Sequence, residues 1–287
     1  MFEHRTLARV IKFSGIGLHS GKIANVRLVP SDIGTGIRAI RTDILDRNNE
    51  IKLDYTNVSI ATYSTKISNE FGACVNTVEH LMAAIWAMKI SNLTIEIDAE
   101  EMPIMNGSAQ EFVFLLEAAG VLKQGAVRAI AKINRKICVN YDDGREISVE
   151  PADNFIATFH LNDLAKIIAS GSGYTFNDAK QSFINDISLA RTYCKMSDVE
   201  KLKAAGLAGG GGLHNAIVVD GETVLNSGGL HYNNEFVRHK ILDLIGDFAL
   251  CDYYIAGHFT GKNSGHEMNN KLMREIFAAS ENFTITQ

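Results

Sequence analysis

An internal repeat limits the folds open to this chain more than any other feature of its sequence. The segment VEHLMAAIWAMKISNLTIEI, from Val78, can be laid over VRHKILDLIGDFALCDYYIA, from Val237, and each copy reads as a helix, a turn and a strand. The alignment pairs His80 with His239 and continues without gaps until Gly107 is paired with His266. The sequence therefore predicts two related halves, each built from helices and strands.

The predicted fold class is α+β. After each copy the chain reads as a further helix, FVFLLEAAG or KLMREIFAA, while ISVEP, AIVVD and YYIAG read as strands. Two duplicated domains that bury their helices against each other form a layered sandwich, with the helices packed between outer β-sheets. The stretch GVLKQGAVR at 120–128 separates the halves, so we predict domains at 1–124 and 125–287.

Composition and charge exclude several classes of protein. The 287 residues are 46% hydrophobic and 21% charged, which is typical of a folded protein rather than a disordered chain. The formal net charge is -5 and no basic cluster with interleaved aromatic residues occurs, so nucleic acid is not an expected partner. Because no apolar stretch is long enough to span a membrane and no signal sequence is present, we expect a cytoplasmic protein without a transmembrane segment.

The cysteines point to the kind of metal site that this chain can build. They are widely scattered and form no CxxC pair: Cys74, Cys138, Cys194 and Cys251. This distribution fits reduced thiols better than a disulfide framework or a zinc site made of cysteines. A metal ion would therefore be bound by histidine and carboxylate side chains.

Three polar residues follow one another at intervals of one helical turn in EFVRHKILDLIGDFAL: His239, Asp243 and Asp247. An imidazole and a carboxylate at this spacing can bind one metal ion from a single rigid helix. Taken alone, the pattern more often describes the solvated face of an amphipathic helix. The repeat favours the metal site, because packing of the two related helices would bring His80 to the same point.

His80, His239 and Asp243 then form a set of three protein ligands. Three ligands leave the fourth tetrahedral position for water, as in catalytic rather than structural zinc sites. Glu79, next to His80, is the candidate general base. The alternative for Glu79 is a capping box with Asn76, in which the carboxylate turns back to the start of its own helix.

His266 is the candidate general acid. It lies in GKNSGHEMNN, a loop rich in Gly and Asn whose backbone freedom lets an imidazole reach a neighbouring site. A nearby carboxylate such as Asp247 would raise the pKa of His266 and keep it protonated. In the alternative, His266 is an ordinary loop or cap residue. The GGGG run at 209–212 lacks the Lys-Ser/Thr of a phosphate-binding loop and reads as a flexible turn.

Several motifs, in the same order along the chain, together resemble one enzyme family. They are SGIGLHSGK at 14–22, TVEHLMAA at 77–84, EMPIMNGSAQEF at 101–112, LARTY at 189–193, EFVRHKILDLIGD at 235–247 and SGH at 264–266. They are similar to motifs of the UDP-3-O-acyl-N-acetylglucosamine deacetylases, the zinc amidases of lipid A synthesis. The resemblance spans nearly the whole chain and implies a duplicated two-domain sandwich with an insert in each domain beside the active site.

The resemblance also implies roles for the residues found from spacing. One zinc ion would be held by His80, His239 and Asp243, with iron as the alternative ion. Glu79 would be the base and His266 the acid, steadied by Asp247. The substrate would be a UDP-linked acylated amino sugar, hydrolysed by a monomer to acetate and the free amine.

Further residues enter through the resemblance alone. Thr192 in LARTY would donate a hydrogen bond to the oxyanion, and Lys240 would contact the polar head of the substrate or its developing charge. Tyr193 and His19 are additional substrate-binding candidates. The insert of the second domain is expected between about residues 159 and 190, with an acyl passage lined by its apolar side chains: Leu161, Leu164, Ile167, Ile168, Tyr174, Phe176 and Phe183.

Two functions of other kinds compete with the deacetylase. A non-catalytic carrier would hold an acyl chain without stoichiometric zinc or chelator-sensitive activity. A dehydratase acting on acyl thioesters would use a His/Glu pair without metal and would release water instead of acetate.

Overall fold

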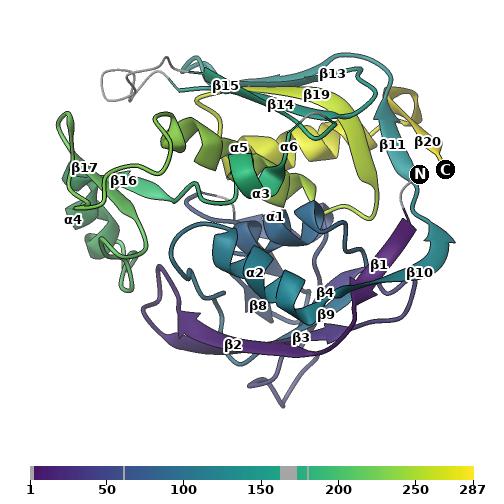
Figure 1. The fold of residues 1–287 in the computed structure, drawn as a ribbon, viewed down its shortest axis with the longest axis horizontal. Helices are drawn as coiled ribbons and strands as arrows, with labels where there is room; N and C mark the ends of the chain where they lie inside the picture. Colours follow the sequence, from purple (N-terminus) through teal and green to yellow (C-terminus); the bar gives the residue numbers. More distant parts are fainter. Residues whose placement is uncertain (1–2, 61, 162–172, 180) are drawn as a thin grey trace.

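The computed structural model describes residues 3–60, 62–161, 173–179 and 181–287. Figure 1 shows two β-sheets on opposite sides of the molecule with the main helices layered between them. These helices are α1 (Glu79–Ala87), α2 (Gln110–Ala119), α5 (Glu235–Phe248) and α6 (His266–Phe277). The predicted α+β class, with helices between outer sheets, is confirmed.

The two sheets contain similar series of strands, as the predicted repeat leads one to expect. The five-stranded sheet has the order β2 (Ile11–Ile16), β3 (Ile23–Pro30), β9 (Leu93–Ile97), β4 (Ile37–Arg41) and β5 (Glu50–Lys52). The seven-stranded sheet contains the series β12 (Ile137–Asn140), β13 (Glu146–Glu150), β19 (Tyr254–Lys262), β14 (Phe155–His160) and β15 (Gly173–Asn177). In both, the central strand is antiparallel to one neighbour and parallel to the other. The strands β11 (Ile130–Ile133) and β20 (Phe283–Thr286) extend the second sheet.

The sheets are amphipathic where one face is solvated. Along β3, the buried residues Ala24, Val26 and Leu28 alternate with exposed ones, as expected when successive side chains point to opposite faces. The central strand β9 is buried at four of its five residues because it lies inside the sheet. Each sheet therefore presents an apolar inner face to the helices.

The helices have little solvated surface. In α1 every residue from Glu79 to Trp86 is buried, which confirms the expectation that this helix is enclosed on nearly every side. In α5 the stripe containing His239, Asp243 and Asp247 is buried as well, so the alternative of a solvated amphipathic face is wrong. Carboxylates and imidazoles enclosed in this way need partners, because burial of an unpaired charge is costly.

Shorter elements complete the described fold. The pair β1 (Glu3–Leu7) and β10 (Val121–Val127) is antiparallel, and β10 runs across the predicted domain boundary at 124/125, which stays a prediction. Beside the first sheet lie η1 (Tyr55–Asn57), β6 (Val58–Ile60), β7 (Lys66–Ser68) and β8 (Cys74–Val75). The second half adds α3 (Phe183–Asp186), β16 (Tyr193–Lys195), α4 (Met196–Ala204), β17 (Ile217–Asp220), β18 (Thr223–Val224) and η2 (Ser280–Asn282).

Candidate active site

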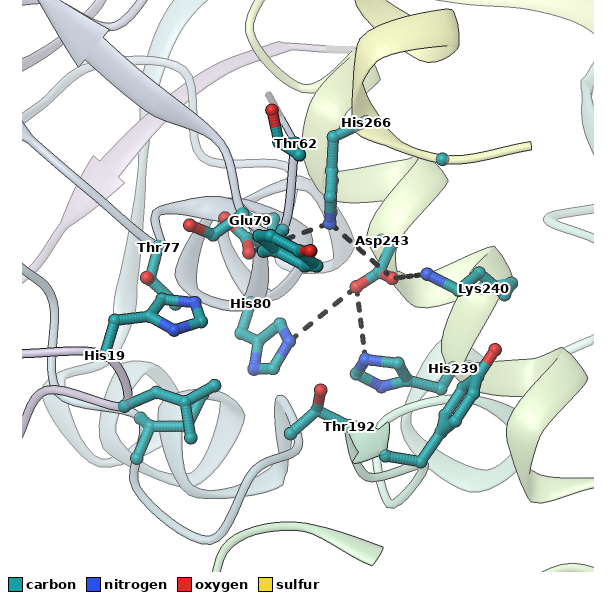
Figure 2. Close-up of a pocket in the computed structure, with 16 residues that line it drawn as sticks. His19, Thr62, Thr77, Glu79, His80, Thr192, His239, Lys240, Asp243 and His266 are labelled. Atoms are coloured by element: carbon teal, nitrogen blue, oxygen red, sulfur yellow. Dashed lines mark hydrogen bonds and ion pairs between the residues drawn. The ribbon is translucent and has the colours of Figure 1, made fainter. Parts of the chain in front are cut away.

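The close approach of α1 and α5 creates the site. A Cβ atom built on Gly246 would lie 2.1 Å from the backbone oxygen of Glu79, so only glycine allows the two helices to meet at this distance. The approach brings His80 and His239 together, with ring centroids 5.1 Å apart and ring planes nearly perpendicular. The structure thus places the two repeat-related histidines side by side (Figure 2).

Asp243 completes a cluster with the geometry of a metal site. Its Oδ1 atom lies 3.3 Å from Nε2 of His239 and 3.7 Å from Nε2 of His80. One ligand atom from each of the three residues lies within 4.8 Å of the others, and all three residues are buried. Two imidazole nitrogens and a carboxylate oxygen form a donor set suited to a divalent ion such as zinc.

The surroundings of the cluster fit a bound cation. Nδ1 of His239 lies 3.0 Å from the carbonyl oxygen of Ala190, which places the ring proton on Nδ1 and leaves the lone pair of Nε2 facing Asp243. Oδ1 of Asp243 is buried without a hydrogen-bond partner among the described residues. An acceptor oxygen left unpaired between two imidazoles is the arrangement that a cation would satisfy.

Electrostatics keep these ligands in the forms that bind metal. Burial lowers the pKa of His239 to about 3, against the opposing charge of Asp243, so the ring stays neutral. Burial alone would raise the pKa of Asp243. Interaction with the His239 ring, together with the charges of Lys240 and His266, outweighs it and holds that pKa well below its usual range.

Glu79 does not act as a helix cap. No side chain caps the start of α1, and the backbone amide of Asn76 donates to the carbonyl oxygen of Glu100 instead of to a carboxylate. Oε2 of Glu79 accepts a hydrogen bond of 3.1 Å from the backbone N–H of Thr65. Burial raises the pKa of Glu79, against the charge of His266, which suits a carboxylate that must accept a proton near neutral pH.

His266 begins α6 and its ring is held between carboxylates. Nδ1 lies 2.8 Å from Oδ2 of Asp247. Nε2 lies 3.9 Å from both Oε1 of Glu79 and Oδ2 of Asp243 (Figure 2). Burial would lower the pKa of His266, but the charges of Asp247 and Asp243 outweigh it and raise that pKa to about 9. The residue is therefore protonated at neutral pH, and its Nε2 proton faces the cluster.

Thr192 and Lys240 line the same cavity of about 200 Å³. The backbone amide of Thr192 is fixed by the carbonyl oxygen of Gly107 at 2.8 Å. Nζ of Lys240 lies 2.8 Å from Oδ2 of Asp243, so this ammonium already has a carboxylate partner inside the site. The structure places both predicted residues at the site, with Lys240 directed to a predicted metal ligand.

Tyr193 and His19 lie where this polar cavity meets a second, apolar one. The ring of Tyr193 packs edge-on to Phe236 and His239, with centroids 4.9 and 6.1 Å apart. Both ring nitrogens of His19 are buried without a hydrogen-bond partner among the described residues. Polar atoms without partners beside a cavity are available to a ligand.

Two buried glutamates that the sequence reasoning did not find position these residues. Glu101 accepts hydrogen bonds from the backbone amides of His19 and Ser20, at 2.9 and 2.7 Å. Glu235, fully buried, accepts from the backbone amide of Arg191 at 3.0 Å and from its Nε at 2.8 Å. Both glutamates belong to the motifs quoted above, but only the fold shows that each one positions a loop of the site.

The apolar cavity is not lined by the described residues that were predicted for the acyl passage. It has a volume of about 350 Å³ and is walled by β16, α4 and the 208–225 region, including Met196, Val199, Leu202 and Val218. Of the side chains predicted to line it, Leu161, Phe176 and Phe183 belong to the hydrophobic core, Tyr174 packs against that core, and Leu164, Ile167 and Ile168 lie outside the described residues. The acyl passage at 159–190 stays a prediction, although Phe176 packs in the core because β15 pairs with β14 of the main sheet.

The GGGG run forms a turn that packs against the loop at 17–21, and Gly211 and Gly212 line the apolar cavity. The backbone amides of Gly209 and Gly210 donate to the carbonyl oxygens of His19 and Leu18, each at 3.0 Å. A Cβ atom on Gly210 would lie 2.2 Å from the oxygen of Gly17. Glycine is needed there for close packing of two backbones.

Comparison with known proteins agrees with the motifs. A family model described as UDP-3-O-acyl N-acetylglycosamine deacetylase matches residues 4–278. The chain belongs to this family. Among curated members of this deacetylase family, the UDP-3-O-acyl-N-acetylglucosamine deacetylase of Hahella chejuensis is 41% identical over 98% of this chain and 92% of its own length. The deacetylase of the same name from Chromohalobacter salexigens is 41% identical over 99% of this chain and 93% of its own.

Among the described residues, no helix has both the length and the apolar character needed to cross a membrane.

Proposed function

We propose that this chain is a metal-dependent amide hydrolase of lipid A biosynthesis. It removes the N-acetyl group from UDP-3-O-(3-hydroxyacyl)-N-acetylglucosamine and releases acetate. Family membership supports this reaction, and the observation that carries it is the convergence of a buried carboxylate and a protonated histidine on the cluster of His80, His239 and Asp243. An amide hydrolase needs such a base, an acid and an electrophile at one point.

We assign one catalytic Zn²⁺ to His80, His239 and Asp243, with iron as the alternative ion because these ligands accept several divalent metals. A divalent ion held there supplies Lewis-acid polarisation of the acetyl carbonyl and lowers the pKa of water. The hydrogen bond from His239 to Ala190 orients one ligand, and the ion pair with Lys240 restrains Asp243.

The chain's own residues move the protons. Glu79 takes a proton from the attacking water, since its buried carboxylate has a raised pKa and faces the cluster. His266 gives the proton on Nε2 to the departing amine nitrogen, while Asp247 holds Nδ1 and keeps the ring charged. Thr192, on the far side of the cavity, donates to the developing oxyanion.

The two adjoining cavities match an amphipathic substrate. We place the amino-sugar end in the polar cavity, where Lys240 and His19 offer polar contacts, and the acyl chain in the apolar cavity beyond Tyr193. A monomer with domains at 1–124 and 125–287, acting in the cytoplasm without nucleic acid, fits this assignment. The non-catalytic carrier and the dehydratase predict no acetate release.

The test replaces the proposed base. We expect Glu79→Ala to abolish acetate release from a UDP-3-O-(3-hydroxyacyl)-N-acetylglucosamine while the purified protein keeps stoichiometric metal, because Glu79 is not a ligand. Glu275→Gln, an exposed carboxylate on α6, serves as the control. Full turnover by the alanine variant, or a wild-type protein without metal and without acetate release, would contradict the proposal.

A further inference from the structure

Thr65 is hydrogen bonded to Glu79, the proposed base, and to Asp247, which contacts the proposed acid His266. It is buried, at 2% exposure, and immediately precedes β7 in the first half of the chain. Its backbone N–H donates to Oε2 of Glu79 at 3.1 Å, and its hydroxyl donates to Oδ1 of Asp247 at 2.6 Å. One residue therefore contacts the base directly and the carboxylate behind the acid.

The hydroxyl contact fixes the orientation of Asp247. An ionised carboxylate can only accept, so the single hydroxyl proton of Thr65 is committed to Oδ1. Oδ2 then accepts hydrogen bonds from Nδ1 of His266 and Nδ2 of Asn269, each at 2.8 Å. With both oxygens engaged, the carboxylate cannot rotate without breaking a buried hydrogen bond to a charged group, which is among the stronger hydrogen bonds in proteins.

The backbone contact orients Glu79 in the same way. Because Oε2 is held by the amide of Thr65, Oε1 is the oxygen that faces Nε2 of His266, at 3.9 Å. The carbonyl oxygen of Thr65 accepts from the backbone amide of Val78, so the position of Thr65 is tied to the start of α1. A displacement of Thr65 would therefore move the base and release Asp247 together.

We propose that Thr65 is a positioning residue of the deacetylation, which sets the acid His266 through Asp247 while its amide sets the base Glu79. The inference rests on the proposed function. Thr65 does not itself line the cavity and is not one of the predicted metal ligands, and its hydroxyl is bonded to Asp247, so the loss of that hydroxyl acts on turnover rather than on metal or substrate binding. A purely structural tie between the two halves would instead change stability and leave the turnover of the folded enzyme intact.

The experiment compares variants at Thr65 in the metal-loaded enzyme. Thr65→Val removes the hydroxyl but keeps the branched shape, and Thr65→Ala removes it without adding a methyl group, so the comparison survives if one of them does not fold. We expect kcat for acetate release to fall roughly 10- to 100-fold in both, as for other residues behind a catalytic group, with KM and metal content unchanged. Thr65→Ser, which keeps the donor, should recover most of the rate.

Thr94→Val is the matched control, since Thr94 is also buried and its hydroxyl is hydrogen bonded, to Ser31 and Arg38, away from the site. It should leave kcat unchanged. Wild-type kcat in folded Thr65→Val or Thr65→Ala, or an equal loss in Thr65→Ser, would overturn the inference while the proposed function stands. Absence of acetate release from the wild-type enzyme would overturn both.

A double-mutant cycle with Asp247→Asn shows whether Thr65 acts through that carboxylate. If it does, Thr65→Val should cost much less in the Asp247→Asn background than in the wild type. Independent losses that multiply in the double variant would refute the coupling of Thr65 to Asp247.

Discussion

Gly246 decides whether α1 and α5 approach closely enough to form the site, and Gly246→Ala tests this requirement. Two effects of opposite sign compete. Alanine in a helix interior is favoured over glycine by roughly 1 kcal/mol. The added Cβ would lie 2.1 Å from the oxygen of Glu79, whereas ordinary contact begins at 3.4 Å, so the helices must separate by about an ångström.

The steric effect should prevail. Overpacking of a buried contact typically costs about 1–3 kcal/mol, so we expect a net destabilisation of up to about 2 kcal/mol. The loss of affinity at the proposed metal site should be more pronounced than the loss of fold stability, because ligand positions tolerate displacements of only about 0.2 Å. Moving His80 away from His239 should weaken the proposed binding of zinc at least about ten-fold.

The two quantities are measured separately. Urea unfolding of the metal-free protein gives the stability change, and competition with a chromophoric chelator gives the zinc affinity. Gly228→Ala is the control, since a Cβ there meets no atom within 4 Å and its φ is not positive. A Gly246→Ala protein that is more stable than the wild type and binds zinc equally well would refute the argument from helix contact.

Three further predictions follow from the same structure. The charges of Asp247 and Asp243 outweigh burial and raise the pKa of His266 to about 9, from roughly 6.5 in the unfolded chain. Protonated His266 should therefore stabilise the metal-free fold by about 3 kcal/mol below pH 6.5, and this contribution should be lost as the pH rises through 9. Urea unfolding should show the loss in the wild type and not in His266→Gln, and equal losses in both proteins would count against the prediction. Glu235→Gln leaves the guanidinium of Arg191 without its buried carboxylate partner and should lower the free energy of unfolding by roughly 3–5 kcal/mol. Urea unfolding measures this change, and a loss below about 1 kcal/mol would show that the ion pair does not stabilise the fold. Leu202→Trp partly fills the apolar cavity and should raise KM more for long-chain than for short-chain substrates, so an equal change for both would mean that the acyl chain binds elsewhere.

The sequence by itself determined the plan of the molecule and the centre of the site. The repeat predicted two related halves, and the structure contains two sheets with matching strand orders around paired helices. The one-turn spacing of His239, Asp243 and Asp247 placed their side chains along one stripe of α5, since helical periodicity is a local property. These features survive in any fold that packs the two helices together.

The direction of each polar side chain was decided only by the tertiary structure. Glu79 does not take the alternative role of a helix cap, because the backbone amide of Thr65 donates to its carboxylate beside the cluster. Lys240 pairs with Asp243, a contact that spacing permits but does not require. A short motif does not specify which of several nearby donors a buried carboxylate will take.

The apolar cavity shows the same limit. Apolar residues occur both at 159–190 and at 193–225, and the sequence pattern does not distinguish their roles. In the structure, Phe176 and Phe183 fill the core, while Met196, Leu202 and Val218 surround a cavity. The difference arises because β15 pairs with β14 of the main sheet, whereas β16 and β17 form a separate small sheet beside the site. Periodicity predicts that a residue is buried, but strand pairing over long distances decides whether it packs against the core or lines a cavity.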